Sequence, residues 1–62
     1  GSCSIKNLDS STSLRIGDSN AGAARGHELK AGESIILSTT AEIYAYNPSG
    51  TTVLVSLVEV EE

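Results

Sequence analysis

Residues 51–60, with the sequence TTVLVSLVEV, carry apolar side chains on both sides of an extended strand. Successive side chains of a strand point to opposite faces, so the apolar residues divide into two sets. One set is Val53, Val55 and Leu57, and the other is Leu54, Val58 and Val60. A strand with one face in water is not apolar on both faces. We therefore expect the second set to contact a neighbouring subunit or a larger protein shell.

The size of the chain also points to partner subunits. A chain of 62 residues is one domain. We assign it to residues 3–62, because Gly1 and Ser2 resemble what an expression tag leaves behind. A core of this size contributes only about 3–5 kcal/mol. The single cysteine, Cys3, forms no internal disulfide, and with the single histidine, His27, it offers two ligands where structural zinc needs about four. Association with other chains is the remaining source of stability.

The chain alternates between short apolar segments and turn residues, which predicts an all-β fold. The predicted strands are residues 3–8, 13–16, 27–29, 34–38, 41–46 and 51–60. We expect a small antiparallel β-sandwich or barrel of about six strands. The first two strands are predicted to form a hairpin. Consecutive apolar residues in 34–38 predict burial of that strand on both faces, and glycine-rich residues 17–26 predict a mobile loop.

A weak internal sequence similarity relates two of the predicted turns. Asn7 and Asn47 each precede a turn, and the turns lead to Thr-Ser-Leu at residues 12–14 and Thr-Val-Leu at residues 52–54. A duplication and an independent repetition of turn chemistry both explain this spacing.

Charge and motifs favour a protein without catalytic equipment. A net charge of −4 argues against a nucleic-acid surface, because phosphate binding needs clustered Lys and Arg. No apolar run approaches the roughly 18 residues of a membrane span. His27 with Asp18 and a serine lacks the other elements of a catalytic triad. The run Asp18-Ser19-Asn20 opens like a calcium loop, yet a capped turn explains it better. We expect no enzyme activity, no cofactor and no metal.

Three single residues keep open roles. Cys3 is expected to be a buried or incidental thiol, since no basic neighbour lies closer in sequence than Lys6. Arg25 is expected to be a solvated loop charge, and an anchor for a carboxylate on a partner is the alternative. His27 is expected to lie at a strand edge.

Tyr44 and Tyr46 share one face of a predicted strand, because they are two residues apart. Two tyrosines on one face could stack on a sugar ring, which makes them a possible ligand face. The favoured interpretation is that both pack in a core or at a subunit contact with their hydroxyls at its margin.

Four segments carry turn-and-strand motifs in a fixed order. They are SLRIGD at residues 13–18, LKAGESIIL at 29–37, IYAYN at 43–47 and SGTTV at 49–53. Followed by a valine-rich strand with a glutamate, this order resembles that of small tailed-bacteriophage virion proteins. The likeness covers most of residues 5–60 and defines a scaffold with no catalytic signature.

The resemblance implies a structural accessory of a phage particle, such as a capsid decoration, head fibre or tail appendage. It implies a β-sandwich that forms a homo-oligomer, for example a trimer, and contacts capsid or tail proteins. The protein would be assembled in the host cytoplasm and lie on the virion surface. A tip module that binds a host-surface glycan through Tyr44 and Tyr46 is the alternative function.

Overall fold

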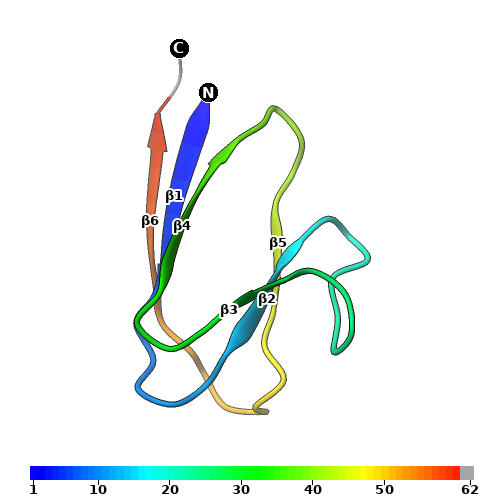
Figure 1. Ribbon diagram of the computed structural model, residues 1–62, viewed down its shortest axis with the longest axis vertical. Coiled ribbons are helices and arrows are strands. Elements are labelled where there is room, and N and C mark those ends of the chain that lie inside the picture. Colours follow the sequence, from blue (N-terminus) through cyan, green and yellow to red (C-terminus); the bar gives the residue numbers. More distant parts are fainter. Residues whose placement is uncertain (61–62) are drawn as a thin grey trace.

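The computed structural model describes residues 1–60, which form six strands and no helix (Figure 1). The strands are β1 (Ser2–Asn7), β2 (Leu14–Gly17), β3 (His27–Leu29), β4 (Ser34–Ser38), β5 (Tyr44–Tyr46) and β6 (Val55–Val60). The predicted bounds of β3 and β4 are confirmed. β5 and β6 begin later than predicted, and β1 includes Ser2, one of the two residues set aside above.

The strands form two antiparallel sheets of three strands each, with the orders β4-β1-β6 and β3-β2-β5. We call them the first and the second sheet. In the first sheet, Ile5 of β1 lies opposite Ile35 of β4 and Leu57 of β6. In the second sheet, Ile16 of β2 lies opposite His27 of β3 and Ala45 of β5. The expected all-β, six-stranded fold is confirmed, and the arrangement is consistent with a small β-sandwich.

The expected hairpin between the first two strands is wrong. β1 pairs with β4 and β6, whereas β2 pairs with β3 and β5. Within residues 1–60 the chain passes between the sheets four times: residues 8–13 and 39–43 lead from the first sheet to the second, and residues 30–33 and 47–54 lead back (Figure 1). β1 and β2 each have one buried face. These two faces exclude more water when the strands lie in opposing sheets than when they lie side by side in one sheet.

The core between the sheets is small. Its buried apolar side chains are Cys3 and Ile5 from β1, Leu14 and Ile16 from β2, and Leu29 from β3. Partly buried Ile35, Leu37, Ile43 and Val53 pack against it. Of the two expectations for Cys3, a buried or an incidental thiol, the structure shows the buried one. With so few fully buried side chains, the hydrophobic contribution to folding is limited.

Burial of β4 on both faces is not observed. Only Ile35 and Leu37 turn toward the core, while Ile36 between them is 75% exposed. The side chains of β4 alternate between a core face and an outer face, and none of the strands in residues 1–60 covers the outer one. The apolar run therefore has one face in the sandwich and one on its surface.

Asn7 ties the two sheets together at one end of the sandwich. Its side chain is fully buried, with 0% exposure. Its Nδ2 donates to the carbonyls of Thr12 at 2.8 Å and Leu29 at 3.0 Å, and its Oδ1 accepts the N–H of Asp9 at 2.9 Å. The fixed position of Asn7 therefore holds the end of β1, the first crossover and the end of β3 together.

Candidate interaction surface

The outer face of the first sheet carries an apolar surface that no part of residues 1–60 covers. In the register of β1, Ser4 lies between Ile36 of β4 and Val58 of β6, and Ser2 lies opposite Val60. Because these side chains alternate with the buried Cys3 and Ile5, they point away from the core. We call the exposed apolar residues of this side the outer face: Leu8, Ile36, Leu54, Val58 and Val60.

The predicted contact residues lie on this outer face. Leu54 is 69% exposed, Val58 56% and Val60 50%. The chain therefore does not shelter them by itself, which is the condition on which the prediction of a contact depends. Leu54 lies next to Leu8, whose N–H donates to the Leu54 carbonyl at 3.0 Å.

Two members of the outer face were missed from the sequence. Ile36 was assigned to a doubly buried strand, and Leu8 was counted only as the end of the first one. The period-two pattern held the signal for Ile36, since it places Ile35 and Leu37 together and Ile36 opposite. The sequence pattern could not show which face of β4 is covered, because that depends on where the second sheet packs.

The sandwich is open along one side, where β5 and β6 are the edge strands of their sheets. A groove of about 780 Å³ lies there. Cys3, Ile5 and Leu57 line it from the first sheet, and Ile43 and Ala45 line it from the chain at β5. Glu59 also lines the groove, and it comes from the inward side of β6. All six residues of β6 are exposed, including those that turn toward the interior.

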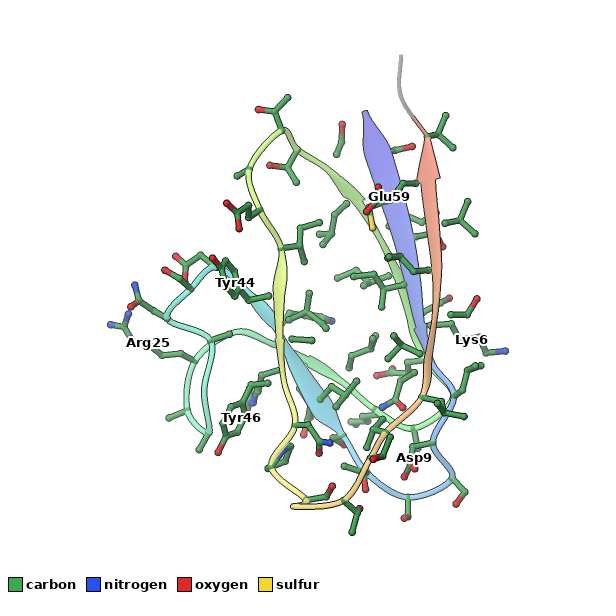
Figure 2. All side chains as sticks on the ribbon, turned by 180° about the vertical axis from the view of Figure 1, so that it is seen from behind. Lys6, Asp9, Arg25, Tyr44, Tyr46 and Glu59 are labelled. Carbon is green, nitrogen blue, oxygen red and sulfur yellow. The ribbon has the colours of Figure 1, made fainter. Side chains whose placement is uncertain are left out.

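Tyr44 and Tyr46 lie on the side of the second sheet that faces away from the core, as Figure 2 shows. They stand opposite Gly17 and Arg15 of β2, while Ala45 between them lies opposite the buried Ile16. Tyr44 is 43% exposed and Tyr46 is half-buried. The hydroxyl of Tyr44 donates to the carboxylate of Glu42 at 3.2 Å. Neither ring is part of the buried core, so core packing does not explain the pair.

Arg25, His27 and Asp18 do not belong to the outer face of the first sheet. Arg25 is exposed beside a hollow of about 310 Å³ that Asp18 also lines. Figure 2 shows Arg25 on the same side as the two tyrosines, opposite to Lys6 and Asp9. His27 begins β3 and is exposed. Asp18 Oδ1 accepts the N–H of Asn20 at 2.9 Å, so this run is a capped turn.

Loop 17–26 has internal hydrogen bonds. Gly22 and Arg25 bond each other in both directions, with N–O distances of 3.0 and 3.2 Å. Gly26 follows with φ +107°, and a Cβ there would lie 2.9 Å from the carbonyl oxygen of Ile16. The backbone of the loop therefore passes too close to β2 for any side chain at this position.

Residues 1–60 contain no group of three or more His, Cys, Asp and Glu side chains placed to hold a metal ion. No helix in this part of the chain is long and apolar enough to cross a membrane.

No family model, no curated protein and no solved structure matches this chain. The resemblance to small phage virion proteins therefore stays a prediction from the sequence. The outer face, the open side of the sandwich and the tyrosine pair are the features from which a function can be argued.

Proposed function

We propose that this protein is a non-enzymatic structural module of a bacteriophage particle, a capsid decoration or surface accessory that works through protein–protein contacts. It would lie on the virion surface as a homo-oligomer that contacts capsid or tail proteins. The exposure of Leu54, Val58 and Val60 carries the contact part of the proposal. The phage assignment has the motif order of the sequence as its support.

The composition of the outer face supports a contact with protein. Monomeric soluble proteins rarely expose large contiguous apolar patches, and those that they expose mark interaction sites. Here Ile36 and Val58 flank the small side chain of Ser4, and Val60 lies two residues along β6. The small side chain of Ser4 between these two apolar residues leaves room for side chains of a second protein surface.

Sedimentation velocity of the purified chain, from micromolar to several hundred micromolar, tests the proposal. We expect concentration-dependent association of the unaltered protein. Ile36→Asp should weaken it, because a carboxylate in the contact would lose its hydration. A strict monomer with a cooperative melt would contradict the proposal.

Ser34→Asp is the matched control for Ile36→Asp. Ser34 lies on the same strand and the same face, two residues away, and its row contains Lys6 and Ser56 in place of apolar side chains. Both variants add the same charge to β4. If Ser34→Asp weakens association as much as Ile36→Asp, the effect comes from net charge, and the outer face is not the contact.

Glycan binding is the second candidate function, and the exposure of Tyr44 favours it over burial of both rings. Tyr44 and Tyr46 share a face, with Gly17 and Arg15 in the neighbouring strand. A glycan array tests this function. Binding that is lost in Tyr44→Ala would support it, and an array without signal would remove it.

A further inference from the structure

We propose that β6 pairs antiparallel with β6 of a second copy, so that Leu57 lies opposite its own counterpart. The two first sheets then form one continuous sheet across a two-fold axis. This inference deepens the proposed function, on which it rests, by naming the partner and the register. It also leaves the outer face of both copies free, because strands that pair edge to edge keep their faces exposed.

β6 is an edge strand, and no strand of residues 1–60 pairs with the edge that faces away from β1. Leu8 donates its N–H to the carbonyl of Leu54, so Leu54 directs its polar groups toward β1. Polar groups alternate in direction along an antiparallel strand. Val55, Leu57 and Glu59 therefore direct their N–H and C=O groups away from β1. On the other side of β1, Asn7 donates its N–H to Glu33 at 2.9 Å, which fits the same alternation.

One register of β6 against itself uses all of these outward groups. With Leu57 opposite Leu57, Val55 lies opposite Glu59 and Glu59 opposite Val55. These are the three residues with outward polar groups, so each forms a hydrogen-bonded pair. The same register places inward side chains beside inward ones. On the outer side it sets Ser56 opposite Val58, so the apolar surface continues from one copy to the other.

Charge is compatible with this pairing, although each copy carries −4. Glu59 faces Val55, and the two Glu59 side chains are four residues apart along the strand. Four residues span roughly 13 Å, which exceeds the Debye length of about 8 Å at physiological ionic strength. Glu59 also lies in the open groove, where its carboxylate stays in water. A register centred on Glu59 would set the two carboxylates face to face.

The size of the contact predicts a weak dimer. The five paired residues, 55–59, cover a strip about 17 Å long. A standard interface takes roughly 800 Å² from each partner, just under a fifth of the 4335 Å² that this chain exposes. The strip is smaller than that, so we expect micromolar affinity. A two-fold contact of this kind closes on itself and leaves no free β6 edge.

Cysteine cross-linking tests the register. In a Cys3→Ser background, Leu57→Cys should form a disulfide-linked dimer under mild oxidation. Hydrogen-bonded antiparallel pairs have Cα atoms about 5.5 Å apart, within the range of disulfides. Ser56→Cys alone and Val58→Cys alone should not link, but an equal mixture of the two should. A mixture of Val55→Cys and Glu59→Cys gives the same information if Leu57→Cys does not fold.

A proline variant tests the role of the backbone. Leu57→Pro removes an N–H that points to the free edge, which a monomer tolerates at an edge strand. We expect a monomer with an unchanged far-ultraviolet circular dichroism spectrum. Ile36→Asp should leave the Leu57→Cys cross-link intact, because Ile36 lies on β4, away from the β6 edge.

The outcomes separate this inference from the proposed function. Association that is sensitive to Ile36→Asp, without cross-links at Leu57 or between positions 55 and 59, overturns the β6 pairing and leaves the function. If the predicted cross-links form and Ile36→Asp leaves association unchanged, the β6 pairing is supported and a contact through the outer face is contradicted. A strict monomer at several hundred micromolar overturns both.

Discussion

Two of the four crossovers between the sheets in residues 1–60, residues 8–13 and residues 47–54, use the same side-chain chemistry under opposite conditions of burial. Asn7 Oδ1 accepts the N–H two residues ahead, and so does Asn47 Oδ1, at 2.9 and 3.0 Å. Their Nδ2 atoms donate to the carbonyls of Thr12 and Thr51 at 2.8 and 2.6 Å. Yet Asn7 is fully buried, and Asn47 is exposed.

The likeness extends to the next polar residue of each crossover. Asp9 Oδ2 accepts the N–H groups of Ser11 and Thr12 at 3.0 and 2.7 Å, and Ser49 Oγ accepts the N–H of Thr51 at 3.2 Å. Local hydrogen bonding alone therefore does not decide how much an asparagine contributes. What differs is whether water can replace the bonds when the side chain is removed.

Asn7→Ala should give the largest loss of stability. The carbonyls of Thr12 and Leu29 and the N–H of Asp9 would lose their partners in or beside the core. We expect a loss of about 3 kcal/mol, close to the whole stability of such a domain. Urea unfolding, followed by circular dichroism, measures it. A loss below about 1 kcal/mol would show that water reaches these groups.

Gly50→Ala should cost about 1 kcal/mol, because an L side chain disfavours its φ of +74°. No atom within 4 Å would meet the new Cβ, so the cost comes from the backbone alone. Among residues 8–13 of the first crossover, none has positive φ. Gly50→Asn should recover part of the loss, since asparagine tolerates this conformation better. Equal stability of both variants would contradict a backbone origin.

Asp9 should make the first crossover sensitive to acid. Hydrogen bonds from the backbone N–H groups of Thr12 and Ser11 lower the pKa of Asp9 below its usual value. The folded protein thus favours the ionised carboxylate of Asp9. Its contribution to the free energy of unfolding is present above the pKa of the unfolded state and is lost as pH falls through the pKa of the folded state. Unfolding free energies between pH 6 and pH 2 measure it. Asp9→Asn should have a smaller pH dependence than the unaltered protein, and identical slopes would refute the assignment.

Asn47→Ala should have the smallest effect, about 0.5 kcal/mol or less. Water can replace each hydrogen bond that its exposed side chain forms. The same urea experiment serves as the matched control for Asn7→Ala. If both variants lose similar amounts, burial is not what distinguishes the two crossovers.

Much of the fold followed from local patterns in the sequence. The turn residues and period-two segments located β3 and β4, and the alternation of the last segment separated its two faces. Leu54, Val58 and Val60 were named on that basis, and the structure leaves them exposed.

Strand pairing did not follow from the same patterns. The run Asp9-Ser10-Ser11-Thr12 does form a turn, but the turn changes sheet where a hairpin was expected. Whether the chain after a turn stays in the same sheet depends on which apolar strand faces, far apart in the sequence, become buried against each other. The residues of the turn do not determine this. The burial of Asn7 was invisible for the same reason, because its partner Leu29 lies far along the chain.

The position of β1 between β4 and β6 has a consequence for folding during translation. The ribosome makes β1 well before β6, one of its two partners, since Ser2 lies opposite Val60. Until residues 55–60 emerge, β1 has at most β4 beside it, and its other edge is open. Pairing over such long separations is slow. The first sheet is therefore completed only after translation of β6, and until then the open edge of β1 can pair with other chains.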